Sequence, residues 1–133
     1  MVLPLFAVIA PFLVWPIELI FPYPHIVEEL AKAVLIFFVA KDDNSSKTTK
    51  VKSAIFIGLL FAFSEDVLYL FNIALVGSLE TFFERLLLTT FLHVVTSLLI
   101  LFPILKSHKL LPFGIALAMV LHYLFNLTIQ MMT

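Results

Sequence analysis

Residues 24–40 read PHIVEELAKAVLIFFVA, an apolar stretch of helical length in which Glu28 and Glu29 are adjacent and Lys32 follows. A charged side chain in hydrocarbon costs on the order of 3 kcal/mol or more, so charges inside such a stretch indicate a functional site. The simpler interpretation is an interfacial acidic pair, because a helix N-terminus favours negative charge and Lys32 lies one turn after Glu28.

The rest of the chain is equally apolar, which excludes an ordinary water-soluble domain. Of its 133 residues, 62% are hydrophobic and only 13% are charged. Since a bilayer span needs about 20 apolar residues, we expect one all-α domain over residues 1–133, a multi-pass transmembrane bundle of about five helices. The expected helices cover, approximately, residues 2–21, 24–40, 53–76, 81–102 and 110–132. The first reads as a retained, proline-kinked span rather than a cleaved signal peptide.

The breaks between these segments set the connections and the orientation. The sequence 22–24 (PYP) predicts a tight turn, 41–52 (KDDNSSKTTKVK) a flexible loop, and Pro103 the end of the fourth helix. Six lysines lie in the second and fourth connections, whereas the opposite connections offer only Arg85. The positive-inside rule therefore predicts a cell-membrane protein with a cytoplasmic N-terminus and an external C-terminus.

Four ionisable residues on four different helices share one predicted depth. Glu28, Glu65, His93 and His122 each lie 13 positions from the nearest loop lysine on their own helix. At about 1.5 Å per residue, all four lie roughly 20 Å from the lysine-rich side, beyond the bilayer midplane. We expect these side chains to form one cluster.

Helical spacing gives three of these helices a polar stripe that faces the cluster. Gly58 and Ala62 lie on the stripe of the third helix, where small residues permit close helix packing. The stripes comprise Gly58, Ala62, Glu65, Tyr69 and Asn72; Arg85, Thr89, His93 and Ser97; and His122, Asn126 and Gln130. Asp66 is turned about 100° from Glu65, and its role stays open.

Charge and cysteine content exclude several kinds of function. The formal net charge of −1 and the missing basic patch speak against a nucleic-acid partner. Since the chain has no cysteine, it has no disulfide, thiol nucleophile or cysteine-bound metal.

Four motifs in sequence order resemble the PrsW family of intramembrane proteases, within the wider superfamily of CAAX prenyl endopeptidases and bacteriocin-processing enzymes. The motifs are Glu28-Glu29-x-x-Lys32, the block 58–69 with Glu65 and Tyr69, the stretch 85–97, and His122-x-x-x-Asn126. CAAX endopeptidases usually carry histidine at the position of Glu65, so the resemblance is closer to PrsW. The chain is shorter than larger PrsW members and has compressed connections.

The resemblance implies hydrolysis of a peptide bond in or beside the membrane without a covalent intermediate. Glu28 and His93 would activate water, His122 and Asn126 would hold the oxyanion, and Glu29 and Glu65 would orient these groups. Lys32, Tyr69, Arg85 and Ser97 would support them. A carboxylate or imidazole can accept the proton of water, and an amide and imidazole can donate to a developing negative charge. No metal or other cofactor is expected, and the substrate would be a single-span or lipid-anchored membrane protein or peptide in the lipid bilayer.

Two other functions use the same residues. His93, His122 and one glutamate could bind zinc in a metalloprotease, although no HExxH helix is present. A proton-coupled transporter or channel would also need buried acids and histidines, but the sequence has no inverted repeat. The oligomeric state stays open.

Overall fold

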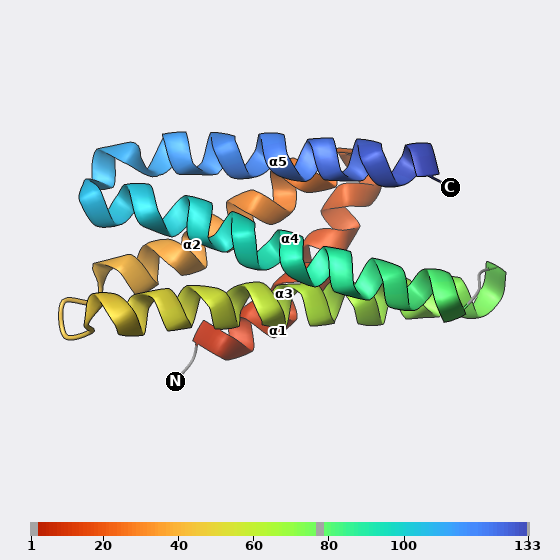
Figure 1. Cartoon of the computed structure of the whole chain (residues 1–133), viewed down its shortest axis with the longest axis horizontal. Helices are drawn as coiled ribbons and strands as arrows, with labels where there is room; N and C mark the ends of the chain where they lie inside the picture. The colour runs from red at the N-terminus through yellow and green to blue at the C-terminus, as the bar shows by residue number, and fades with distance from the viewer. Residues whose placement is uncertain (1–2, 77–78, 133) are drawn as a thin grey trace.

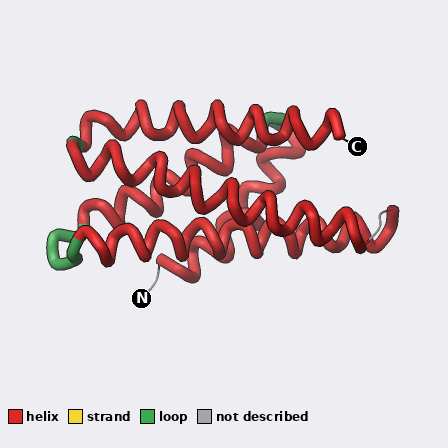
Figure 2. Tube along the Cα trace, viewed as in Figure 1, coloured by secondary structure: helices red, strands yellow, loops and turns green. Residues whose placement is uncertain are grey.

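The computed structural model describes residues 3–76 and 79–132, which form an all-helical bundle (Figures 1 and 2). The elements are α1 (Leu3–Ile20), α2 (Pro24–Lys41), α3 (Lys47–Val76), α4 (Leu79–Lys106), the 3-10 turn η1 (His108–Leu110) and α5 (Leu111–Met132). The prediction of a multi-pass bundle with five helices is confirmed. Four of these helices, α1, α3, α4 and α5, are long and apolar enough to cross a membrane.

Helices α3, α4 and α5 are each antiparallel to the next, and α1 and α2 pack on them as a hairpin (Figure 1). The connections 42–46 and 107–110, with their flanking lysines, lie at one end of the bundle, which we call the lysine end. The turn between α1 and α2 and the C-terminal end of α5 lie at the other end, which we call the open end.

Helix α2 contacts all four other helices, while Leu30, Val34 and Phe38 on its outer face are exposed. The charged residues in its first half are buried, since Glu29 and Lys32 are 0% exposed and Glu28 is 6% exposed, whereas Lys41 at its last position is exposed. Apolar residues fill the bundle from these charges toward the lysine end, with Ile36, Ile57 and Ile100 among the most deeply buried. The bundle is therefore apolar in one half and polar in the other.

The predicted loop 41–52 is wrong in length, because α3 begins at Lys47 instead of about residue 53. Ser46 acts as the helix cap: its hydroxyl accepts the backbone N–H of Thr49 at 3.1 Å. The remaining turn is closed by Asp42, whose carboxylate accepts the Asn44 N–H and the Ser45 hydroxyl. These two hydrogen bonds lower the pKa of Asp42.

The predicted end of the fourth helix at Pro103 is also wrong, since α4 continues through Pro103 to Lys106. A proline removes the helical donor to the carbonyl four residues earlier, here Leu99. That carbonyl faces Gly114 of α5, where a β-carbon would lie only 2.9 Å from the Leu99 oxygen. Close packing by a neighbouring helix lets a membrane helix tolerate an internal proline.

Candidate active site

Ten buried polar or charged side chains come from α2, α3, α4 and α5. Contacts made by several of these side chains connect the four helices. The ten are Glu28, Glu29, Lys32, Ser64, Asp66, Thr89, His93, Thr96, Ser97 and His122. His93 Nε2 lies 2.5 Å from Glu65 Oε2 and 3.9 Å from Glu28 Oε2, and His122 Nε2 lies 3.9 Å from the same Glu28 oxygen. The structure thus brings together the four residues that the sequence placed at one depth.

Lys32 connects α2 to α4 and makes three side-chain hydrogen-bond contacts. Its Nζ atom lies 2.7 Å from Glu29 Oε1, 2.7 Å from Thr96 Oγ1 and 2.9 Å from His93 Nδ1. The ammonium also lies 5.3 Å from the centre of the Phe61 ring. Because a buried charge is tolerated only when it is paired and hydrogen-bonded, this set of partners accounts for a lysine with no exposed surface.

Glu29 links Lys32 to α5 through a single oxygen atom. Its Oε1 accepts from Lys32 and lies 2.9 Å from His122 Nδ1. Within residues 3–76 and 79–132, Glu29 Oε2 and Glu28 Oε2 are both buried without a hydrogen-bond partner. Glu28 Oε2 differs in position, because it lies 3.9 Å from the Nε2 atoms of both histidines. An unpartnered carboxylate oxygen between two imidazoles is a chemically reactive arrangement, because it can accept a proton from a bound molecule.

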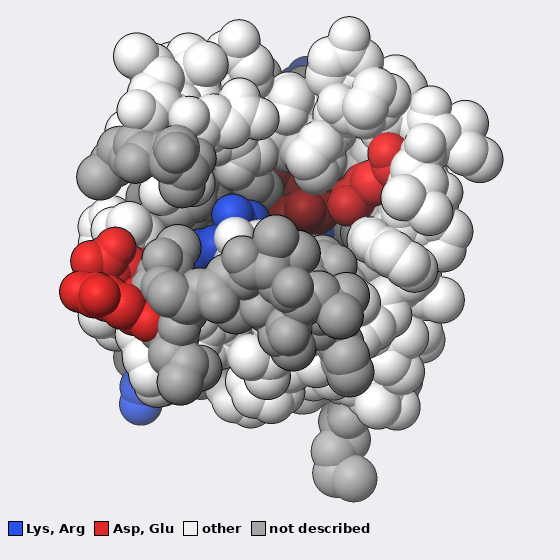
Figure 3. All heavy atoms as spheres, turned by 90° about the vertical axis from the view of Figure 1, so that its right-hand side faces the viewer, with Lys and Arg blue, Asp and Glu red and all other residues white. Residues whose placement is uncertain are grey.

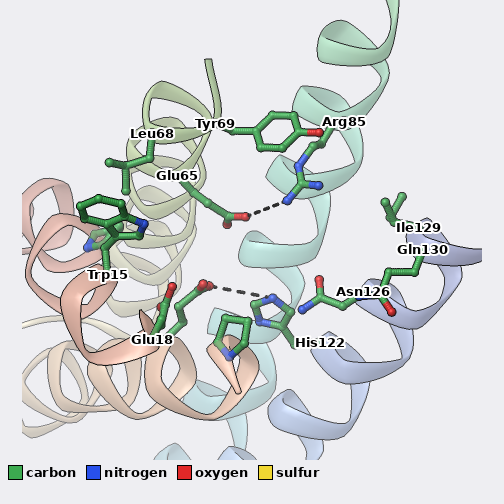
Figure 4. Close-up of a pocket in the computed structure, with 13 residues that line it drawn as sticks. Trp15, Glu18, Glu65, Leu68, Tyr69, Arg85, His122, Asn126, Ile129 and Gln130 are labelled. Atoms are coloured by element: carbon green, nitrogen blue, oxygen red, sulfur yellow. Dashed lines mark ion pairs between the residues drawn. The ribbon is translucent and has the colours of Figure 1, made fainter. Parts of the chain in front are cut away.

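A cavity of about 320 Å³ opens onto Glu28, Glu65 and His122 and is lined by polar residues from all five helices, while His93, Glu29 and Lys32 lie behind this lining. It is lined by Pro11, Trp15, Glu18, Pro24, Glu28, Glu65, Leu68, Tyr69, Arg85, His122, Asn126, Ile129 and Gln130. Figure 4 shows His122 and Asn126 side by side on α5, facing Glu18 and Glu65 across the cavity. Viewed from the open end, acidic and basic side chains lie in a depression of the surface (Figure 3).

Arg85 forms one wall of the cavity and lies over the face of Tyr69, with 3.9 Å between the guanidinium carbon and the ring centre. One of its terminal nitrogens is 3.6 Å from Glu65 Oε1 (Figure 4). Arg85 therefore offsets the charge of Glu65 on the side away from His93.

One group in the described part of the chain has the arrangement of a metal site. A ligand atom from each of Glu28, Glu65 and His93 lies within 4.8 Å of the others. Carboxylate oxygens and imidazole nitrogens are common ligands of zinc.

The remaining residues singled out in the sequence have separate positions. Asn126 and Tyr69 line the cavity, but the Ser97 hydroxyl donates to the His93 carbonyl at 2.8 Å and braces the helix backbone. Asp66 is buried, and its Oδ2 has no partner among the described residues. The side chain of Asn72 lies outside the described residues.

Sequence reasoning missed Glu18, which belongs to α1 and lines the cavity opposite His122. Its buried Oε1 has no hydrogen-bond partner among the described residues. The signal was present, because Glu18 is a lone acid in an otherwise apolar helix and meets the same criterion that identified Glu28. Trp15, one turn earlier, lines the same wall.

Comparison with known proteins gives one match. A family model described as "PrsW family intramembrane metalloprotease" matches residues 19–133. No curated protein and no solved structure matches the chain.

Proposed function

The chain belongs to the PrsW family of intramembrane proteases, and from this premise we propose that its cavity hydrolyses a peptide bond with a water molecule activated by Glu28. The protein is a multi-pass membrane peptidase, so its substrates are membrane-associated. We assign the reaction to six residues: Glu28, Glu29, Glu65, His93, His122 and Asn126.

The observation that carries this proposal is the position of Glu28 Oε2. This atom is buried, has no hydrogen-bond partner among the described residues, and lies 3.9 Å from both His93 Nε2 and His122 Nε2. A water molecule at this point would donate a hydrogen bond to the carboxylate and stay within reach of an imidazole.

The reaction follows from these positions. As the water oxygen attacks the peptide carbonyl carbon, Glu28 accepts the water proton and the carbonyl becomes an oxyanion. Asn126, on the cavity wall beside His122, carries an amide that can donate to this oxyanion. Collapse of the tetrahedral intermediate breaks the C–N bond, and the proton held by Glu28 passes to the leaving amine.

The family description implies a metal ion, and the trio Glu28, Glu65 and His93 is the group to test. The Nδ1 atom of His93 faces the Lys32 ammonium, which has N–H donors and no acceptor. A neutral His93 then carries its proton on Nε2, the nitrogen that faces both carboxylates, and has no lone pair there for a metal. The trio in this arrangement does not fit a metal ion, and the proposed reaction uses none.

The cavity position suits a substrate that is cut near the outer surface of the membrane. The cavity-lining residues of α5 lie in its second half, far from Lys106 and Lys109 at the lysine end. If the lysine end is cytoplasmic, as the positive-inside rule predicts, the cavity opens on the external side. A single-span protein could present the peptide that follows its transmembrane helix to this opening.

The direct test is cleavage by the purified protein in detergent, with a panel of single-span substrates that carry a soluble tag. We expect Glu28→Gln to abolish cleavage, while the matched variant Glu84→Gln, at an exposed position on α4, cuts at the wild-type rate. Both should show the same helical circular dichroism. Wild-type cleavage by Glu28→Gln would refute the proposal, and cleavage in detergent, where no ion gradient exists, would refute a transporter.

A further inference from the structure

The two central histidines differ in the partner of their Nδ1 atoms. Lys32 faces Nδ1 of His93 and Glu29 faces Nδ1 of His122. We infer that the buried Glu29–Lys32 pair fixes the two imidazoles as opposite tautomers, so that His93 offers an Nε2–H donor and His122 offers a basic Nε2 atom.

The tautomer of His93 follows because each of the three N–H groups of the Lys32 ammonium needs an acceptor. The Thr96 hydroxyl donates to the His93 carbonyl at 3.3 Å, so its oxygen is free to accept from Lys32. Glu29 accepts a second donor. The third donor points at His93 Nδ1, which must accept it, because an N–H at this position would face an ammonium group that has no lone pair.

The other side of the His93 ring agrees with this tautomer. With Nδ1 as acceptor, a neutral imidazole has its proton on Nε2, and Nε2 lies 2.5 Å from Glu65 Oε2. The Nε2–H group therefore donates to the Glu65 carboxylate. The Arg85 guanidinium beside that carboxylate favours its ionised, accepting form.

His122 has the opposite arrangement because its partner can only accept. Glu29 is 0% exposed and paired with Lys32, which keeps it ionised, and an ionised carboxylate has no proton to donate. His122 Nδ1 therefore carries the proton and donates to Glu29 Oε1 at 2.9 Å. The lone pair is left on Nε2, which lies 3.9 Å from Glu28 Oε2.

Lys32 is thus a positioning residue that acts through His93. On the proposed function, the two acceptors in the cavity are Glu28 Oε2 and His122 Nε2, and a water between them can donate one hydrogen to each. The proton released during attack passes to one of these acceptors, while His93 holds Glu65 by donation. This division differs from the resemblance, which pairs Glu28 with His93 and gives His122 to the oxyanion.

Nitrogen NMR measures the tautomers directly, because protonated and unprotonated imidazole nitrogens resonate far apart. The double variant His25→Gln, His108→Gln, labelled with 15N-histidine in lipid nanodiscs, leaves signals from His93 and His122 only. We expect one ring with its proton on Nε2 and a through-space correlation from Nδ1 to a lysine, and one ring with its proton on Nδ1. Two rings of the same tautomer, or a doubly protonated His93, would overturn the inference.

A variant then tests the role of Lys32. Lys32→Met keeps the length of the side chain but has no N–H donor, so the His93 Nδ1 signal should lose its lysine correlation and shift to that of a nitrogen without a hydrogen bond. His93 Nε2 should keep its proton through Glu65, and His122 should keep its own tautomer. Cleavage should fall on the order of 100-fold, the usual contribution of a positioned acid or base. Lys47→Met, at an exposed position, is the matched control and should change neither signal nor rate. An unchanged His93 spectrum in a folded Lys32→Met protein would also overturn the inference.

The two proposals fail separately. If Lys32→Met does not fold, the wild-type tautomers in the labelled double variant still decide the question. Opposite tautomers together with full cleavage by Glu28→Gln would keep this inference and reject the proposed function. Equal tautomers together with an inactive Glu28→Gln would reject this inference and keep the proposed function.

Discussion

Gly58 of α3 is packed directly against the backbone of His93 on α4. A β-carbon at Gly58 would lie 2.6 Å from the His93 carbonyl oxygen and 2.8 Å from Val94 Cα. These are backbone atoms, which cannot move aside as the end of a flexible side chain could. The absence of a side chain at Gly58 therefore sets how close Glu65 and His93 can come.

Gly58→Ala should push α3 away from α4 and lower both stability and cleavage. Overpacking of this kind costs about 1–3 kcal/mol. The midpoint of thermal unfolding in detergent measures the first effect, and the cleavage rate of the folded protein measures the second. Gly114→Ala is the matched control: it is similarly tight, at 2.9 Å from the Leu99 oxygen, but it contacts Leu99 and Ile100 instead of His93. Wild-type cleavage by Gly58→Ala would contradict this prediction.

Glu18→Leu should slow cleavage, whereas Glu18→Gln should retain most of it. Glu18 lines the cavity with a buried, unpartnered Oε1 that can accept a hydrogen bond from the substrate, and a glutamine amide oxygen can still accept one but leucine cannot. Loss of one hydrogen bond to a charged group corresponds to about a 10-fold lower kcat/KM or more. Equal kcat/KM for the leucine and glutamine variants would show that the hydrogen bond does not contribute.

Ser46→Ala should destabilise the protein without changing its catalytic rate. The hydroxyl of Ser46 caps α3 at the lysine end, far from the cavity, and loss of such a cap costs about 1 kcal/mol. Denaturant unfolding followed by circular dichroism measures the change, and Ser46→Asp, which can also cap, should restore stability. A large loss of cleavage in folded Ser46→Ala would mean that the cap also influences the cavity.

Removal of metal ions should leave cleavage unchanged. The proposed reaction needs only the side chains of the cavity, and Lys32 holds the metal-facing nitrogen of His93 in its protonated form. The measurement is the cleavage rate after dialysis against a strong chelator, together with the metal content of the active protein. Activity that is lost on chelation and restored by zinc would refute metal-free hydrolysis and require the other tautomer of His93.

The sequence was sufficient to predict the helices and the clustering of four residues. Long apolar runs define spanning helices because the bilayer has a fixed thickness. The equal spacing of Glu28, Glu65, His93 and His122 from loop lysines anticipated their contacts because helices packed side by side in one bundle bring residues of equal depth together. The short distance between α3 and α4 followed from Gly58.

The wrong bounds predicted for α3 and α4 have physical causes that the depth of a residue in the membrane does not reveal. The polar residues of 47–52 suggested a loop, but the Ser46 cap and the packing of α3 made them helical. Pro103 would end a helix in water, whereas Gly114 of α5 covers the carbonyl that this proline leaves free. The partners of Lys32 were not predictable, because its contact with His93 joins residues 61 positions apart and depends on the rotation of two helices.

The burial of three charges on α2 has a consequence for the order of events during biosynthesis. Lys32 emerges from the ribosome well before its partner on α4, and Glu29 emerges 93 residues before His122. Alone in hydrocarbon, this helix would carry an uncompensated Glu28 and a Glu29–Lys32 pair without its partners from α4 and α5, so it cannot enter the lipid as an independent unit. The nascent α2 must therefore be sheltered, at the membrane surface or by the insertion machinery, until translation has delivered the last helix.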